Sequence, residues 1–162
     1  MKSLEQNDTF GVGANGEMKN ISFGLFAAEE IVSASGTSIP ADGLVEIISL
    51  NEDGTATVKT DLPLGSYYVK ELATDSHYLL SDTKYPVTFE YAGQDIVVVK
   101  ISANEGKAIE NDLIYGSVTG KKVDEDGNAL GGALIGLFRT DDGEFTKENA
   151  IMTVTSDMLP IE

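Results

Sequence analysis

Ser66-Tyr-Tyr-Val-Lys-Glu-Leu72 is rich in aromatic and β-branched residues and follows the turn sequence Leu62-Pro-Leu-Gly65. A run of this kind, bounded by Pro and Gly, is typical of a β-strand. Because side chains alternate along a strand, Tyr67, Val69 and Glu71 share one face. A carboxylate beside a Tyr and a Val is more common on an outer face than on an inner one. The pattern alone therefore predicts a solvent-facing Glu71.

Similar runs recur on both sides of this strand at intervals of about ten residues, the spacing of a β-sandwich. We predict an irregular first twenty residues with an exposed Gly-rich loop at 10–16, and a single helical turn at 27–31. The Asp-Gly pair in Asn51-Glu-Asp-Gly54 predicts a hairpin turn. Further strands are expected at 21–26, 45–50, 56–60, 85–91, 95–102 and 108–114. The chain is therefore predicted to be all-β.

The sequence contains an internal repeat. Phe23-Gly-Leu-Phe26 recurs as Ile135-Gly-Leu-Phe138, 112 residues later, and such a period matches a small β-sandwich. We therefore expect one complete domain at 1–115 and a truncated second repeat at 116–162. A segment as short as the second cannot close a sandwich of that size. The chain is accordingly expected to be a fragment of a longer protein.

Composition excludes several functions. The 162 residues hold 27 Asp and Glu against 11 Lys and Arg, a formal net charge of −16, which disfavours nucleic acid and anionic membranes as partners. No apolar run approaches the roughly 20 residues of a membrane span, and the absence of cysteine removes disulfides and thiolate chemistry. Asp124-Glu-Asp-Gly-Asn128 lacks the later Glu of a calcium loop, and His77 has no companion ligand nearby. We predict neither a metal nor a cofactor.

Several segments resemble one family in the expected order. Lys122-Val-Asp-Glu-Asp-Gly-Asn-Ala-Leu-Gly-Gly-Ala133 followed by Gly136-Leu-Phe138 resembles the opening of a Cna B-type (SpaA-like, prealbumin-like) domain, a module of Gram-positive surface adhesins and pilins. Leu64-Gly-Ser-Tyr-Tyr-Val-Lys-Glu71 resembles its Gly-x-Tyr strand, and Ile109-Glu-Asn-Asp-Leu-Ile-Tyr-Gly116 its last strand. The resemblance implies an Ig-like, prealbumin-like β-sandwich followed by the first strands of a second repeat.

Many members of this family form an isopeptide bond between a Lys on the first strand and an Asn or Asp on the last, assisted by a Glu. The residue types follow from the chemistry. A lysine amine attacks only when it is unprotonated, and burial favours that form. A buried carboxyl can hold a proton and pass it to the leaving amide nitrogen. The resulting link joins the two ends of the sandwich as a disulfide would.

By this resemblance, Glu71 is the candidate proton shuttle and Asn111 the candidate acceptor, while Lys122 takes the lysine position in the second repeat. Lys2 and Lys19 are the choices for the first repeat, and Lys2 is favoured. Lys2 lies 22 residues before Gly24, whereas Lys122 lies 14 residues before Gly136. An insertion in the Gly-rich loop accounts for the difference.

The resemblance implies a structural or adhesive stalk module rather than an enzyme, exported and attached to the cell wall. Its expected partners are neighbouring repeats of the same chain and, as an adhesin, a host extracellular-matrix protein or glycan. One alternative is a β-sandwich that binds carbohydrate or a host protein through loops around Phe10 and Tyr78. Another is a transthyretin-like scaffold of the kind appended to carboxypeptidases, in which Lys2 or Glu71 would face solvent.

Overall fold

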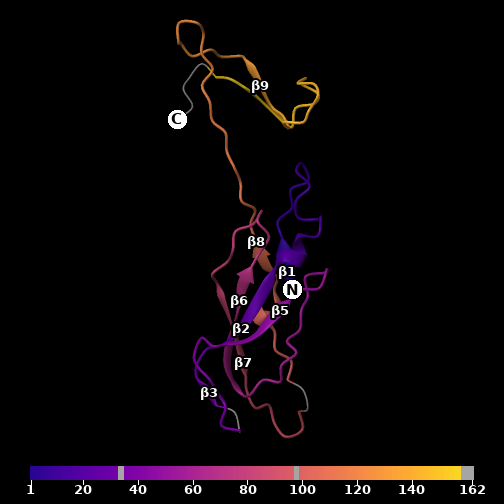
Figure 1. Ribbon diagram of the computed structural model, residues 1–162, viewed down its shortest axis with the longest axis vertical. Helices are drawn as coiled ribbons and strands as arrows, with labels where there is room; N and C mark the ends of the chain where they lie inside the picture. Colours follow the sequence, from indigo (N-terminus) through magenta and orange to yellow (C-terminus); the bar gives the residue numbers. More distant parts are fainter. Residues whose placement is uncertain (33–34, 97–98, 158–162) are drawn as a thin grey trace. The chain divides into compact units, whose positions relative to one another are not determined.

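The computed structural model describes residues 1–32, 35–96 and 99–157. The chain divides into two compact units, Met1–Ile114 and Tyr115–Glu162, which are described separately (Figure 1). The first unit is built on an antiparallel sheet with the strand order β5 (Leu44–Ser49), β2 (Ser22–Ala27), β6 (Gly65–Ala73) and β7 (Lys84–Phe89). All four strands overlap predicted strand segments, so the all-β fold class is confirmed.

One face of this sheet carries the hydrophobic core. Alternation along β2 turns Phe23, Leu25 and Ala27 to the same side, and each is at most 4% exposed. Tyr67 and Val69 of β6 lie on that side as well. Burying one Leu or Phe side chain contributes roughly 1.5–3 kcal/mol, so the burial of these side chains stabilises the unit substantially. The other buried hydrophobic members are Ile21, Ile31, Ile48, Val87 and Ile109.

The two ends of the first unit meet in a second, smaller sheet. β1 (Lys2–Leu4) pairs in parallel with β8 (Ile109–Asn111), and Ile109 belongs to the core that covers the main sheet. A short 3₁₀ helix, η1 (Glu17–Asn20), leads into β2, and a two-stranded hairpin joins β3 (Ile31–Val32) to β4 (Ser38–Ile39). Residues more than a hundred positions apart are therefore neighbours in β1 and β8.

The helical turn predicted at 27–31 is wrong. Ala27 ends β2, and the chain then bends before β3. The N–H groups of Ala27 and Ala28 donate to the carbonyls of Gly43 and Ser66, at 3.0 and 2.9 Å. These long-range partners replace the i−4 carbonyls that a helix would use, so tertiary pairing overrides the helical propensity of the segment.

The predicted turn at Asn51–Gly54 forms, but residues 56–60 are not a strand. The Glu46 carboxylate of β5 accepts hydrogen bonds from the N–H groups of Lys59 and Thr60, at 2.8–3.1 Å. The Glu46 side chain thus occupies backbone N–H groups that would otherwise pair with the carbonyls of a neighbouring strand. The described residues 56–60 that follow the turn therefore form no second strand of the hairpin.

A strand was also predicted at 95–102. Its described residues lie outside any strand, and residues 97 and 98 lie outside the described part of the chain. The following 3₁₀ segment, η2 (Ala103–Gly106), contains Asn104 and Glu105 at φ 52° and 53°. This left-handed turn leads the chain into β8 instead of prolonging a hairpin.

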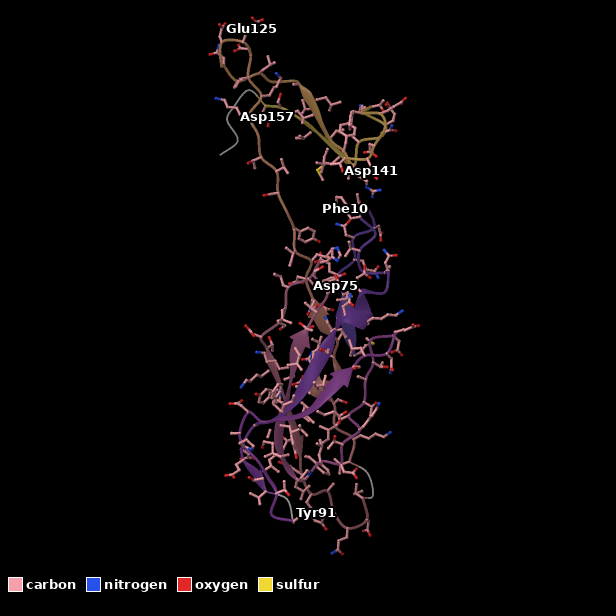
Figure 2. All side chains as sticks on the ribbon, viewed as in Figure 1. Phe10, Asp75, Tyr91, Glu125, Asp141 and Asp157 are labelled. Atoms are coloured by element: carbon pink, nitrogen blue, oxygen red, sulfur yellow. The ribbon has the colours of Figure 1, made fainter. Side chains whose placement is uncertain are left out.

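The second unit contains one antiparallel pair, β9 (Leu134–Leu137) with β10 (Met152–Thr155). The acidic segment Asp124–Asn128 is a tight turn in which Asp124 Oδ1 accepts the N–H groups of Asp126 and Asn128. Figure 2 shows Glu125 and Asp141 on the loops of this unit.

The repeated glycines have the same surroundings in both units. A Cβ on Gly24 would lie 2.5 Å from the ring of Phe26, and one on Gly136 would lie 2.6 Å from the ring of Phe138. In each case the aromatic ring two residues later folds back over the glycine, so a side chain at this position would displace that ring. That the second unit is a truncated repeat stays a prediction.

Candidate functional site

Three polar side chains are buried together at the edge of the core. Lys2 of β1 is 3% exposed, Glu71 of β6 is 1% exposed and Asn111 of β8 is 3% exposed. Buried charged groups are rare unless they have polar partners. The three come from the first, a central and the last strand of the unit, which is the distribution that the family resemblance implies.

The register of the small sheet places Lys2 and Asn111 on one face. Lys2 pairs with Ile109 and Leu4 pairs with Asn111. Paired residues of a parallel ladder point to the same side, and residues two apart on one strand are roughly 6.6 Å apart. Lys2 and Asn111 are thus diagonal neighbours, a separation that a lysine side chain can span.

The amide nitrogen of Asn111 is held by two side chains. Asn111 Nδ2 donates to both oxygens of the Glu71 carboxylate at 2.9 and 3.0 Å, and to Thr74 Oγ1 at 2.9 Å. The backbone N–H of Ser81 donates to Glu71 Oε2 at 3.0 Å. Glu71 is therefore fixed by a backbone donor and by the amide that it contacts.

The other half of the amide has a different environment. Asn111 Oδ1 is buried, and no hydrogen-bond partner for it is found among the described residues. Glu71 contacts the nitrogen of this amide and not its oxygen. The two halves of the amide therefore differ, since among the described residues only the nitrogen has hydrogen-bond partners.

The amine of Lys2 is held by backbone carbonyls of β1 and β8. Lys2 Nζ donates to the carbonyls of Ser3 at 2.6 Å and Ile109 at 3.1 Å. Burial lowers the pKa of the Lys2 amine below its ordinary value, although the negative charges of Glu71, Glu110 and Asp112 partly offset this effect. A larger share of the amine is therefore neutral, and so nucleophilic, than in a solvent-exposed lysine.

Glu71 shares its face with Tyr67 and Val69, as the alternation predicts, but that face is the buried one. The expectation from pattern alone, a solvent-facing carboxylate, is wrong. The expectation fails because Glu71 is held in the interior by tertiary contacts. Its polar partners are Ser81 and Asn111, which are distant in the sequence, so a local pattern cannot show them. Its role as a proton shuttle, which the resemblance implies, stays a prediction.

The other candidate lysines lie in exposed positions. The Lys19 side chain is 71% exposed and its amine lies 3.8 Å from Glu52, so the structure does not bring it to Asn111. Lys122 is exposed in the second unit, where its amine donates to the carbonyl of Val123. Its role in a second repeat remains a prediction.

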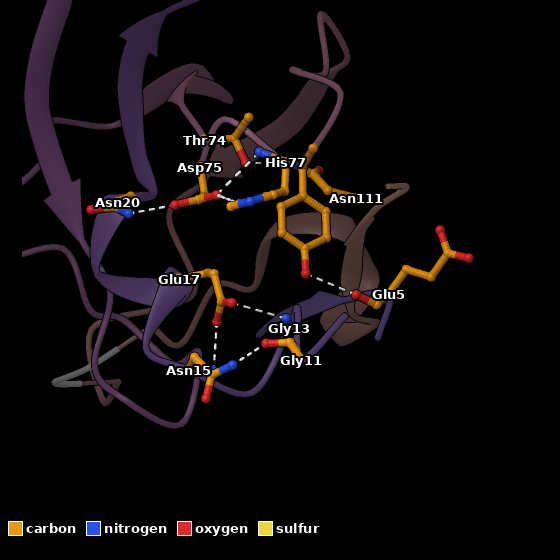
Figure 3. Close-up of polar contacts among 11 residues, drawn as sticks. Glu5, Gly11, Gly13, Asn15, Glu17, Asn20, Thr74, Asp75, His77 and Asn111 are labelled. Carbon is orange, nitrogen blue, oxygen red and sulfur yellow. Dashed lines mark hydrogen bonds and ion pairs between the residues drawn. The ribbon is translucent and has the colours of Figure 1, made fainter. Parts of the chain in front are cut away.

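The loops considered for ligand binding carry one exposed aromatic residue, not two. Phe10 is 51% exposed at its loop (Figure 2). Tyr78, expected at a loop surface, is 3% exposed, and its hydroxyl donates to the carbonyl of Glu5 at 2.8 Å. The expectation for Tyr78 is wrong because this hydroxyl is used to hold the N-terminal segment in place (Figure 3).

His77 lies on the surface, as predicted, with 56% of its side chain exposed, and its Nδ1 lies 2.5 Å from Asp75 Oδ1. Within the described ranges, no three His, Asp or Glu side chains are grouped so as to bind a metal ion. A helix able to cross a bilayer is likewise not found in the part of the chain that the structure describes.

Sequence reasoning missed Thr74 and Gly54, both of which contact the buried cluster. Thr74 lies beyond the recognised motif, and Gly54 belongs to a turn that local sequence explains without any tertiary contact. The only local signal was the Asp-Gly pair itself.

One comparison with known proteins identifies a family. The model of the SpaA domain, described as a prealbumin-like fold domain, matches residues 12–105, more than half of the 162-residue chain. The matched range includes Glu71 and ends before Asn111. Curated proteins and solved structures give no significant match.

Proposed function

The chain belongs to the SpaA prealbumin-like domain family, and on this premise we propose that its first unit closes itself covalently through an isopeptide bond between Lys2 and Asn111, assisted by Glu71. Members of this family are structural modules of surface proteins in Gram-positive pilins and adhesins, and they are not known as enzymes. The observation that carries the proposal is the joint burial of the three side chains, with the Asn111 amide nitrogen on the Glu71 carboxylate.

The proposed reaction is an amide exchange. Neutral Lys2 Nζ attacks Asn111 Cγ, a new C–N bond forms, and the bond from Cγ to Nδ2 breaks. Glu71 takes a proton from the attacking nitrogen and passes it to Nδ2. Ammonia leaves, and the products are one secondary amide and one ammonia molecule. The event happens once for each chain, so it is a maturation step and not turnover.

Such a bond suits a load-bearing stalk. It would connect β1 to β8, the two ends of the unit, in a chain that has no cysteine for disulfides. A tensile force applied at the two ends would then pass through the link without unfolding the main sheet. An amide is also indifferent to reductants, unlike a disulfide.

We further propose that the module works at the cell surface, attached to the cell wall as part of a longer chain, with neighbouring repeats as its first partners. Adhesion to a host matrix protein or glycan belongs to the same proposal. The acidic composition, with a formal net charge of −16, favours a well-solvated surface for such a stalk. Binding through loop aromatics is the weaker candidate because Tyr78 is buried.

The test is the intact mass of the purified chain under denaturing conditions. A mass lower by one ammonia, with a peptide map that joins residue 2 to residue 111, is the expected result. Lys2→Arg and Glu71→Gln should restore the full mass, and the matched control Lys19→Arg should leave the deficit unchanged. A full-mass wild-type chain that is folded would overturn the proposal.

A further inference from the structure

The pairing of β6 with β2 changes register near the end of β6, beside Glu71. Phe23 pairs with Glu71, but the residue before it on β2, Ser22, pairs with Ala73. Leu72 is thus an extra residue on β6, a β-bulge. In a regular strand Glu71 and Thr74 would point to opposite faces, because their separation is odd. The bulge shifts the alternation by one residue, and such bulges commonly re-aim a side chain beside a functional site.

The contacts agree with this shift. Thr74 Oγ1 lies 2.9 Å from Asn111 Nδ2, the same nitrogen that contacts Glu71. An amide nitrogen has two N–H groups, and here one faces Glu71 while the other faces Thr74. Figure 3 shows Thr74 and Asn111 in one cluster with Asp75 and His77.

Thr74 also differs from its neighbours in exposure. Glu71 and Asn111 are 1% and 3% exposed, whereas Thr74 is half-buried. Among the residues that contact the leaving nitrogen, Thr74 therefore lies nearest to solvent. Ammonia that departs from Asn111 has to reach solvent. The Thr74 hydroxyl already accepts a hydrogen bond from this nitrogen, so it can keep contact with the ammonia as the ammonia leaves.

We propose that Thr74 is a second catalytic residue of the cross-linking reaction, beside Glu71, and that it holds the leaving nitrogen of Asn111 while Glu71 protonates it. The inference rests on the proposed function of the site. The Thr74 hydroxyl accepts an N–H of the amide in the ground state. When Lys2 Nζ adds to Cγ, Nδ2 becomes pyramidal and gains a basic lone pair. A hydroxyl can both accept and donate, so Thr74 keeps its hydrogen bond as the C–N bond breaks and ammonia forms.

A second consequence concerns where the proton goes. A carboxyl group in contact with a primary amide can bond either its nitrogen or its oxygen, depending on how the amide is turned. Contact with Thr74 on the second N–H favours the orientation with nitrogen toward Glu71. The proton that Glu71 carries is then delivered to the leaving group, as amide exchange requires.

The experiment follows bond formation during synthesis of the full chain in a cell-free translation system. Samples are quenched in denaturant at successive times, and intact mass gives the fraction that has lost ammonia. Thr74→Val removes the hydroxyl at nearly constant volume, and Thr74→Ser keeps it. Thr88→Val, at an exposed position of β7, is the matched control. The rates are measured from neutral to alkaline pH.

We expect Thr74→Val to slow bond formation about tenfold, the loss of one hydrogen bond to a reacting group. Thr74→Ser should retain most of the rate, and the control all of it. The pH at which the rate is half-maximal should stay unchanged in Thr74→Val, because the Lys2 amine remains buried. A variant that merely loosens the fold would expose Lys2 and move that pH upward.

Three results would overturn the role of Thr74 alone: a wild-type rate in Thr74→Val, an equal loss in Thr74→Ser, or a half-maximal pH shifted upward. In each of these three cases the wild-type chain still loses ammonia, whereas the Glu71→Gln variant keeps its full mass. If the folded wild-type chain never loses ammonia, the proposed function itself fails and the role of Thr74 fails with it. The two failures are thus distinguished.

Discussion

Gly54 lies directly against the backbone of Lys2. The N–H of Lys2 donates to the Gly54 carbonyl at 2.7 Å, and a Cβ on Gly54 would lie only 2.3 Å from the Lys2 carbonyl oxygen. Gly54 also has a φ of 75°, in the left-handed region that favours glycine. The turn at Asn51–Gly54 therefore clamps β1 from the side opposite to β8, and so positions the candidate nucleophile.

Replacing Gly54 by Ala is expected to displace β1 and slow or abolish loss of ammonia. The new methyl group meets backbone atoms, which cannot rotate away. Gly127→Ala is the matched control, because Gly127 has a φ of 84° but nothing within 4 Å of its Cβ. Intact mass of both variants is the measurement. Equal loss of ammonia in the two variants would show that the clamp has no part in the reaction.

The same turn shows what sequence could and could not predict. The Asp-Gly pair correctly predicted a turn at Asn51–Gly54, because turn chemistry is local. It also predicted a returning strand at 56–60, which was wrong, since Glu46 takes the backbone donors of that segment. That Gly54 contacts Lys2 depends on a partner fifty-two residues away in the chain, and no local pattern contains this information.

The residues of the candidate site also differ in how far the sequence could predict them. Glu71 and Asn111 became candidates through the resemblance of whole segments to a family, while alternation by itself pointed Glu71 outward. Thr74 could not be found, because regular alternation places it opposite Glu71, whereas β6 contains a bulge at Leu72 and ends at Ala73, before Thr74. Four strands of the main sheet were predictable because their segments are rich in β-branched and aromatic residues and are bounded by turn residues.

The proposed bond should add substantially to the stability of the first unit. It would close a loop from residue 2 to residue 111, and closing a loop of about 100 residues by a disulfide is worth roughly 4–5 kcal/mol. Glu71→Gln is therefore expected to lose about 4 kcal/mol of unfolding free energy in urea. Lys2→Arg, which blocks the bond through a different residue, should lose a similar amount. Full stability in either unlinked variant would contradict this estimate of the role of the bond.

Acid should destabilise the first unit partly through Asp75, which is 8% exposed. Burial alone would raise the pKa of Asp75, but hydrogen bonds from Asn20 and His77 outweigh it and leave the pKa below its ordinary value. A carboxyl whose folded pKa is lowered contributes stability that is present above its unfolded pKa, about 3.9, and is lost as pH falls through the folded pKa.

Asp75→Asn should therefore lower the unfolding free energy at neutral pH by about 1 kcal/mol. The difference from wild type should shrink as pH falls below about 4, because protonated Asp75 no longer contributes. Urea denaturation at a series of pH values measures both effects. A difference that stays constant down to the lowest pH would show that Asp75 acts through shape and not through its charge.

The segment that follows β8 should be the first site of proteolysis. Residues 114–122 are all exposed and outside any strand, and they include Lys121 and Lys122. A protease needs an exposed backbone that can extend into its active site. Limited trypsin digestion is therefore expected to cut first after one of these lysines and to leave a resistant fragment that contains Lys2, Glu71 and Asn111. Cooperative melting of the purified fragment would show that the first unit folds independently.

The control is the double variant Lys121→Gln with Lys122→Gln, which should remove this cut and preserve the others. An earlier cut at Lys70 or Lys84, within the main sheet, would show that the sheet opens more readily than the connecting segment.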